Sequence, residues 1–194
     1  MSEDPRVTRS RVLILAAAHT HFVTHGYVGA NVDEIAAEAG VSKRTVYNIY
    51  GGKEPLFRAV VEAAIAIAER FSAALADDIA VDDLEGVAER LVGSVLSDRV
   101  IPLRRLLIGE SRRFPELARE YYERAPGLVL RTLAAHLPHH PGLRIDDGEA
   151  AAEHFAFLVL GPPLDRALFD DRVPGDPLDG ARAGVAVFRR AYAR

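Results

Sequence analysis

Residues 31–53 read NVDEIAAEAGVSKRTVYNIYGGK, and they indicate two short helices joined by a tight turn. Asn31, with Glu34 three residues later, has the spacing of a capping box at the start of a helix over 32–39. Gly40 suits the left-handed backbone that ends such a helix. Ser42 is a favourable N-cap for a second helix over 43–49. Two helices across so short a turn are typical of a helix-turn-helix unit.

The second of these helices is rich in hydrogen-bonding side chains. Five fall within six residues, namely Lys43, Arg44, Thr45, Tyr47 and Asn48. A helix that reads the major groove needs donors for phosphates and base edges on its exposed face. The alternative interpretation is a polar face that only meets solvent.

Helical spacing continues on both sides of this stretch, with glycine or proline at most segment ends. Alternating strand patterns followed by hairpin turns are missing, so the sequence predicts an all-α fold of about nine helices. We expect Pro126 to kink one helix, and Gly161, Pro162 and Pro163 to interrupt another before it resumes over 164–169. The other seven predicted helices cover residues 8–25, 53–75, 83–98, 102–113, 115–137, 147–160 and 177–192.

Composition excludes several classes of protein. The 194 residues contain no cysteine, so thiol catalysis, thiolate zinc sites and disulfides are ruled out. Hydrophobic side chains make up 49% and charged ones 27%, a globular balance. The apolar runs are far shorter than the about 20 residues that span a bilayer, and no secretory leader is visible. We therefore expect a cytoplasmic protein with no membrane partner.

Charge is distributed unevenly along the chain. The net charge is −4, yet residues 5–53 hold six basic against three acidic side chains. The two lysines of the chain, Lys43 and Lys53, both lie in this basic segment. A local excess of positive charge favours contact with nucleic acid, although the arginine-rich composition elsewhere also fits a GC-rich gene.

Beyond the helix-turn-helix, motifs follow one another in a fixed order: RVLILAAA (11–18), Phe22, HGY (25–27), VDEIA (32–36), AGVS (39–42), TVY (45–47), Tyr50 and KEPLF (53–57). Over about residues 8–58 this series resembles the DNA-binding domain of TetR-family transcriptional regulators. RFPELA (113–118) is similar to a stretch in one subgroup of their C-terminal domains. The resemblance implies a homodimer, with a DNA-binding domain over 8–54 and a larger effector-binding and dimerisation domain over 55–194.

The resemblance also implies roles for individual residues. Lys43, Arg44 and Thr45 match base-facing positions, and Tyr47, Asn48 and Lys53 match phosphate-contacting positions. Asn31 and Ser42 cap helices whose N-terminal amides face the DNA backbone, where the helix dipole favours an anion. Tyr47-Asn48-Ile49-Tyr50 departs from the family's Tyr-x-His-Phe, and Gly51-Gly52 stands where a polar residue often precedes the lysine. Because of these departures, the operator sequence of a related protein should not be assumed for this one.

The expected partners are double-stranded DNA with a palindromic operator, a small-molecule effector and a second copy of the chain. Dimerisation is expected through the helices over 147–160 and 177–192, and the alternative is that their apolar stripes pack only within one subunit. By the resemblance, nine residues lie near an effector pocket: Phe71, Leu103, Leu107, Glu110, Phe114, Tyr121, Tyr122, His154 and Phe157. The alternative is that the apolar ones are core. Arg104, Arg105, Arg112 and Arg113 are either ligands for an anionic effector or solvated.

Catalysis and metal binding receive little support. Nucleophile elbows, phosphate loops and dinucleotide glycine patterns are missing, so we predict no enzyme, no catalytic residues and no cofactor. His21 and His25 have a spacing that two metal ligands can use, and His136, His139 and His140 cluster around a loop. We interpret both groups as solvated, predict no metal site, and interpret residues 77–83 as a solvated acidic loop.

The leading hypothesis is a sequence-specific transcriptional repressor that an effector releases from its operator. The alternatives are an all-α enzyme or small-molecule-binding protein without working DNA contacts, and a helical module that binds another protein. The basic, hydrogen-bonding segment 43–53 discriminates between them, because neither alternative needs it.

Overall fold

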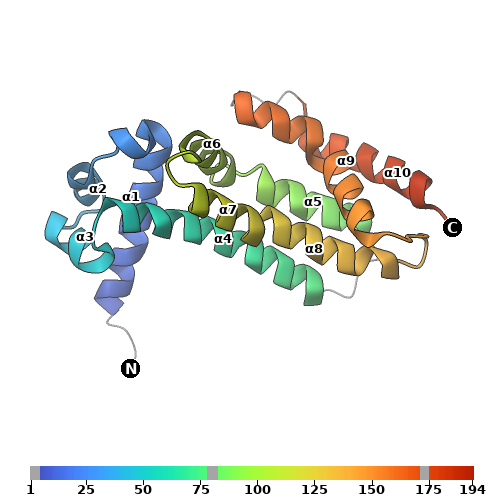
Figure 1. Ribbon diagram of the computed structural model, residues 1–194, viewed down its shortest axis with the longest axis horizontal. Coiled ribbons are helices and arrows are strands. Elements are labelled where there is room, and N and C mark those ends of the chain that lie inside the picture. Colours follow the sequence, from blue (N-terminus) through green and yellow to red (C-terminus); the bar gives the residue numbers. More distant parts are fainter. Residues whose placement is uncertain (1–4, 78–82, 171–174) are drawn as a thin grey trace. The chain divides into compact units, whose positions relative to one another are not determined.

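The computed structural model describes residues 5–77, 83–170 and 175–194, which form ten α-helices and one short 3₁₀-helix (Figure 1). The described residues contain no β-strand, so the all-α prediction is confirmed. None of the helices in these ranges is long and apolar enough to cross a membrane. The helices are α1 (Pro5–Gly29), α2 (Val32–Glu38), α3 (Lys43–Tyr50), α4 (Lys53–Asp77), α5 (Leu84–Val95), α6 (Val100–Glu110), α7 (Pro115–Arg124), α8 (Pro126–His136), the 3₁₀-helix η1 (Leu137–His139), α9 (Gly148–Phe169) and α10 (Pro177–Tyr192).

The helices group into two compact units. The first unit comprises residues 5–64 together with Pro102–Ala118, and the second comprises Ile65–Ile101 with the described part of Arg119–Arg194. Helix α4 therefore contributes its first half to one unit and its second half to the other. The first unit also contains most of α6 and the turn after it, which chain order alone does not indicate.

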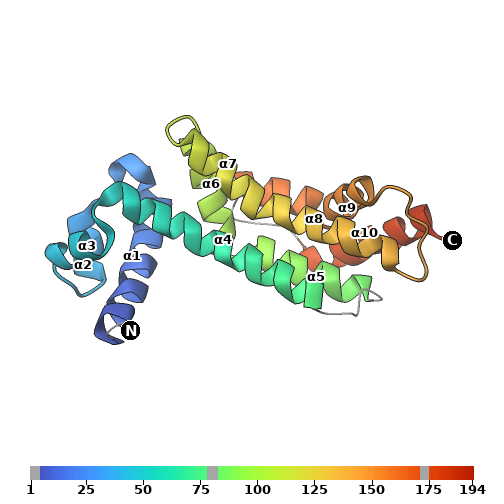
Figure 2. The same cartoon turned by 60° about the horizontal axis from the view of Figure 1, so that its bottom comes forward.

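In the first unit the long helix α1 and the short helices α2 and α3 share one apolar core with the start of α4. Helix α2 packs against α1 and α3 (Figure 2). Phe22 of α1, Ile35 of α2, Val46 of α3 and Phe57 of α4 are fully buried. Because α2 and α3 are too short to be stable alone, this shared apolar core supplies most of their stability.

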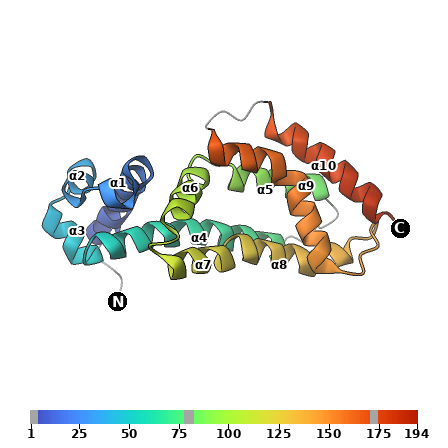
Figure 3. The same cartoon turned by 45° about the horizontal axis from the view of Figure 1, so that its top comes forward.

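The second unit is a helical bundle. Helix α10 packs against α9 and α5, and α9 packs against α8 (Figure 3). At its centre the fully buried rings of Phe155 and Phe188 meet edge to face, with centroids 5.2 Å apart. Asp83 caps α5 by accepting a hydrogen bond from the Gly86 amide at 2.9 Å, whereas residues 78–82 of the predicted acidic loop lie outside the described residues.

Two expectations about proline are wrong. Pro126 does not kink a helix but begins a new one, because Ala125 before it has non-helical angles of φ −110° and ψ −90°. Pro162 and Pro163 do not end α9, which continues through them to Phe169 and changes direction sharply partway along (Figure 3). Packing against α8 and α10 holds α9 together across the missing amide donors.

Candidate nucleic-acid interface

Side-chain caps fix the ends of α2 and α3. The Asp33 amide donates to Asn31 Oδ1 at 2.8 Å, and the Thr45 amide donates to Ser42 Oγ at 3.1 Å. Gly40 takes the left-handed conformation, with φ +66°, in the turn between the two helices. The predicted N-caps and the predicted turn are therefore confirmed. The first-turn amides that the caps do not bind have no acceptor within the helix, and the helix dipole favours an anion at such an end.

Helix α3 presents most of its side chains to solvent. Val46 is its one buried residue, and it packs into the core of the first unit. The exposed residues include Lys43, Arg44, Tyr47 and Asn48. Thr45 is half-buried, and its hydroxyl lies 2.8 Å from Ser42 Oγ. The predicted base-facing and phosphate-facing residues of α3 therefore lie on one short helix in which Val46 is the only fully buried side chain.

Lys43 is paired with an acid of the neighbouring helix. Its Nζ lies 2.8 Å from Asp33 Oδ1, and both side chains are more than half exposed. The hydrogen bond from Lys43 to the Asp33 carboxylate raises the pKa of Lys43 above its ordinary value. Lys43 therefore stays charged at neutral pH, and its ammonium group is held beside α2 by Asp33. The sequence shows no signal for this pair, since ten residues separate its members.

Lys53 lies at the first position of α4. Its Nζ donates to the Val28 carbonyl at 2.9 Å and lies 5.0 Å from the centroid of the Tyr27 ring. An ammonium group has three donors, so this bond leaves donors for a phosphate oxygen. Nearby, the Tyr50 hydroxyl donates to the Arg11 carbonyl at 3.2 Å and ties the end of α3 to α1. Burial raises the pKa of Tyr50, so this hydroxyl keeps its proton.

The nine residues predicted near an effector pocket are divided between the two units. Leu103, Leu107 and Phe114 are buried in the first unit, which also holds the half-buried Glu110. In the second unit Tyr121 is buried and Phe71 half-buried. Tyr122 (58% exposed), His154 and Phe157 (72% exposed) lie at the surface of that unit, where His154 Nδ1 is 2.7 Å from the Tyr192 hydroxyl.

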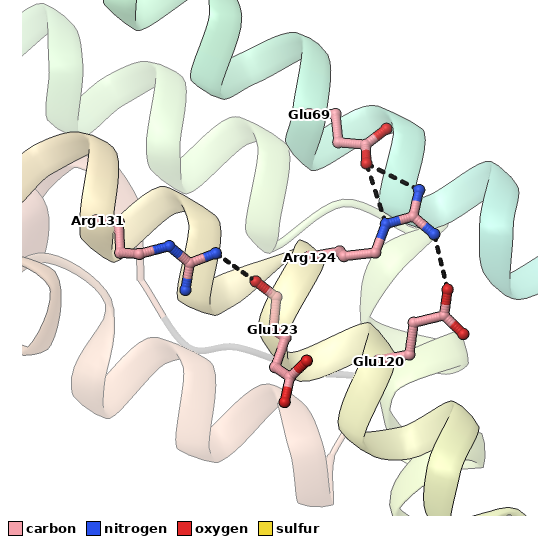
Figure 4. Close-up of polar contacts among 5 residues, drawn as sticks. All are labelled: Glu69, Glu120, Glu123, Arg124 and Arg131. Carbon is pink, nitrogen blue, oxygen red and sulfur yellow. Dashed lines mark hydrogen bonds and ion pairs between the residues drawn. The ribbon is translucent and has the colours of Figure 1, made fainter.

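Two polar features of the second unit were missed by sequence reasoning. Ser72 is 4% exposed, and its hydroxyl has no hydrogen-bond partner among the described residues. Arg124 of α7 bridges Glu69 of α4 and Glu120 of its own helix, each through a contact of 2.8 Å (Figure 4). The four-residue spacing of Glu120 and Arg124 could have revealed half of this network. Nothing in the sequence distinguishes Ser72 from a solvated serine.

At the junction of α7 and α8, Arg131 donates to the Glu123 carbonyl at 2.8 Å (Figure 4). This bond satisfies one carbonyl at the end of α7, where helical partners run out. A shallow groove of about 280 Å³ also occurs in the second unit, between the second half of α9 and the start of α10. None of the nine predicted pocket residues lines it; its lining is Leu158, Val159, Pro162, Pro163, Arg166, Asp176, Pro177 and Gly180.

The histidines are less exposed than predicted. The His21 side chain is 11% exposed, with Nε2 2.9 Å from Glu38 Oε2, and His140 is 8% exposed and accepts from the Gly142 amide at 3.1 Å. The interpretation of both groups as solvated is therefore wrong for His21 and His140, because tertiary contacts bury them. Across the described ranges, no group of three or more His, Asp or Glu side chains is arranged to hold a metal ion.

Comparisons with known proteins agree with this architecture. Residues 14–60 match the model of the bacterial regulatory proteins of the tetR family, and residues 82–194 match the C-terminal domain of AefR-like transcriptional repressors. The chain is 37% identical over 91 residues to the HTH-type transcriptional repressor SCO4008 of Streptomyces coelicolor. That match covers 47% of this chain and 44% of the relative, so it spans less than half of the relative's length.

Solved structures extend the likeness over the whole chain. A TetR-family regulator from Mesorhizobium loti is 30% identical, with a TM-score of 0.81 over 98% of this chain and 100% of the other. The flavonoid-responsive regulator FrrA is 28% identical, with a TM-score of 0.67 over 96% of this chain and 98% of the other. The helix-turn-helix geometry, both family models and these full-length matches agree: the chain belongs to the TetR family of DNA-binding transcriptional regulators.

Proposed function

We propose that this chain is a repressor that binds a palindromic operator as a homodimer and leaves it when a small molecule binds. The observation that carries the proposal is the composition of α3, which buries Val46 and exposes a cation-rich, hydrogen-bonding face beside Lys53. The match to AefR-like repressors and the likeness to the repressor SCO4008 favour repression over activation. An enzyme or a binding module would have no use for such a face.

In this proposal, residues 8–54 form the DNA-binding part. The side chains of α3, together with Lys53, have two roles, base recognition and phosphate contact. Lys43, Arg44 and Thr45 face base edges, where bidentate donors discriminate between base pairs. Tyr47, Asn48 and Lys53 contact phosphates and set the orientation of α3 without reading sequence. Asn31 and Ser42 hold the N-termini of α2 and α3, whose free amides face the DNA backbone.

Dimerisation is proposed through α9 and α10, within a C-terminal part over 55–194. Each of these helices has a buried stripe toward its own unit, marked by Phe155 and Phe188. Each also exposes large apolar side chains elsewhere, with Phe157 72% exposed, Phe169 86% and Val187 41%. Exposed apolar residues on two adjacent helices are typical of an interface between identical subunits.

The effector is proposed to bind in the interior of the second unit, near Phe71 and Tyr121. Ser72 and His140 are the two buried polar side chains of the described residues, and the rest of the core is apolar. The unpartnered Ser72 hydroxyl favours a mainly apolar effector that brings one hydrogen-bonding group. FrrA, which is named for its response to flavonoids, illustrates a small-molecule effector in a similar structure.

Selection of bound fragments from genomic and random DNA tests the proposal and yields the operator. Arg44→Ala should then relax base preference at one position of each half-site, by about 1–3 kcal/mol. Lys53→Ala should weaken binding to all sequences and lower the salt slope by about 1 for each phosphate that Lys53 no longer neutralises. Equal, sequence-independent weakening in both variants would refute the division of roles. Failure to enrich any fragment would refute DNA binding itself.

A further inference from the structure

Tyr27 lies at a break in the first helix. Gly26 has φ +71° and ψ 173°, a conformation that side chains disfavour, and it turns the chain out of the helical path. The Tyr27 amide donates instead to Glu110 Oε1 at 3.3 Å, across 83 residues of sequence. The Glu110 side chain of α6 thus accepts a hydrogen bond from the first amide after the break.

The half-buried Tyr27 ring packs against three phenylalanines of the first unit. It lies 4.7 Å from Phe114, edge to face, 5.2 Å from Phe57 and 6.1 Å from Phe22, measured between centroids. Phe57 and Phe22 are fully buried, and Phe114 is 8% exposed. Of the three pairs, the one with Phe114 is edge to face, and a pair of this kind adds stability beyond the area that it buries.

The same tyrosine supports Lys53. The ammonium lies 5.0 Å from the Tyr27 ring centroid and donates to the carbonyl of Val28, the next residue, at 2.9 Å. A cation over an aromatic face is attracted by the ring quadrupole. The position of the ammonium is therefore set by the segment that Glu110 and Phe114 hold.

Glu110 is well suited to hold that segment. It is the last residue of α6, and its side chain is 17% exposed. Its second carboxylate oxygen accepts from Arg113 Nε at 3.1 Å, and its carbonyl accepts from the Phe114 amide at 2.9 Å. A carboxylate with so little exposure is costly unless hydrogen bonds satisfy it, so its bonds to Tyr27 and Arg113 resist breaking.

We propose that Glu110 and Phe114 are positioning residues: they hold the Tyr27 ring in the place where it supports the Lys53 ammonium. The end of α6 would then control the phosphate contact of Lys53. The proposal rests on the proposed phosphate contact of Lys53. It gives Glu110 and Phe114 a role in transmitting a signal, in place of the effector contact predicted for them. Any movement that draws the end of α6 away from Tyr27 releases the ammonium and weakens operator binding.

The test is a double-mutant cycle on affinity for the selected operator fragment. Lys53→Ala is measured in the wild-type background and in the Glu110→Ala background, with Glu116→Ala as the matched control. Glu116 is an exposed carboxylate in the first turn of α7, so its removal changes net charge by the same amount. We expect Glu110→Ala to reduce the fold-loss caused by Lys53→Ala by about threefold or more, whereas Glu116→Ala should leave it unchanged within about twofold.

The two glutamate variants should change DNA affinity in opposite directions. Removal of a carboxylate by itself strengthens binding to DNA, and Glu116→Ala should do so slightly. Glu110→Ala should instead weaken operator binding and lower its salt slope, because the ammonium is no longer held against the phosphate. An equal cost of Lys53→Ala in both backgrounds, or stronger binding by Glu110→Ala, overturns the proposal.

Second variants keep the proposal testable if Glu110→Ala does not fold. Glu110→Gln keeps an oxygen for the Tyr27 amide but loses the charge beside Arg113, and Phe114→Leu removes the ring contact while keeping an apolar side chain. Phe114→Leu should reduce the cost of Lys53→Ala, and no reduction would overturn the proposal. Glu110→Gln keeps the acceptor for the Tyr27 amide, so it should retain most of that cost. A reduction by Glu110→Gln as large as that by Phe114→Leu would overturn the role given to the Tyr27 contact. If the wild-type protein selects no fragment at all, the proposed function fails first, and the cycle is not reached.

Discussion

Replacement of Gly184 by alanine should push α9 and α10 apart. Pro162 has no amide hydrogen, so the Leu158 carbonyl lacks its usual donor within α9. A Cβ atom at position 184 would lie 2.7 Å from the Leu158 carbonyl carbon, closer still to its oxygen, and 3.2 Å from the Val159 nitrogen. These are backbone atoms, which cannot rotate away as a side chain would. The two helices must therefore separate to accommodate one methyl group.

The expected size of the effect follows from two opposing terms. Alanine is favoured over glycine inside a helix by about 0.8–1 kcal/mol. Overpacking a well-packed contact costs about 1–3 kcal/mol, and a contact with backbone belongs at the upper end. Gly184→Ala should therefore lower the free energy of unfolding by about 1–2 kcal/mol. Gly93→Ala in α5 is the control, because position 93 is exposed and no atom lies within 4 Å of its added Cβ.

Thermal unfolding followed by far-UV circular dichroism measures both variants, at one protein concentration because a dimer's midpoint depends on concentration. For a chain of this size about 1 kcal/mol corresponds to about 2–4 °C. Gly184→Ala should melt about 2–8 °C below the wild type and Gly93→Ala slightly above it. Because α9 and α10 are the proposed interface, Gly184→Ala should also weaken the dimer in light scattering. A midpoint at or above that of the wild type would refute the close approach of the two helices.

Three further predictions concern the interface and the caps. Ser42→Ala should lower the free energy of unfolding by about 1 kcal/mol and weaken operator binding for all sequences, and Ser42→Thr should restore most of both. Unchanged unfolding curves and unchanged DNA-binding titrations for Ser42→Ala would show that Ser42 does not stabilise α3 as an N-cap. Gly51→Ala, at φ +83°, should cost about 1–2 kcal/mol in denaturant unfolding, and Gly51→Asn less, so equal costs would argue against a left-handed cap. Phe157→Asp should shift the protein toward monomer in sedimentation and lower operator affinity, unlike Tyr122→Asp on α7; a dimeric Phe157→Asp would exclude α9 from the interface.

Much of the first unit could be predicted from the sequence because its signals are local. Asn31 and Ser42 cap helices through bonds that span two or three residues, and Gly40 meets a conformational demand of its own turn. Such interactions depend only on neighbouring residues. For the same reason the ordered motifs over 8–58 sufficed for the family resemblance that the comparisons confirmed.

Prolines mark where local reasoning failed. The chemistry of Pro126 and Pro162 is the same, yet one begins a helix and the other lies inside one. The difference comes from surroundings: α9 is held between α8 and α10, and Gly184 admits the backbone around Leu158. Packing against distant segments offsets the loss of the amide donor at Pro162. This packing cannot be predicted from the few residues around the proline.

By itself, then, the sequence determined the all-α class, the helix-turn-helix with its caps, and the residues that α3 exposes. Only the tertiary structure decided which distant groups meet: Lys43 with Asp33, Arg124 with Glu69, and Glu110 with the Tyr27 amide. Capping and turn formation are encoded within a few residues, so they can be read along the chain. Contacts across 10, 55 and 83 residues depend on how the helices pack, and this packing alone places Lys53 on the ring of Tyr27.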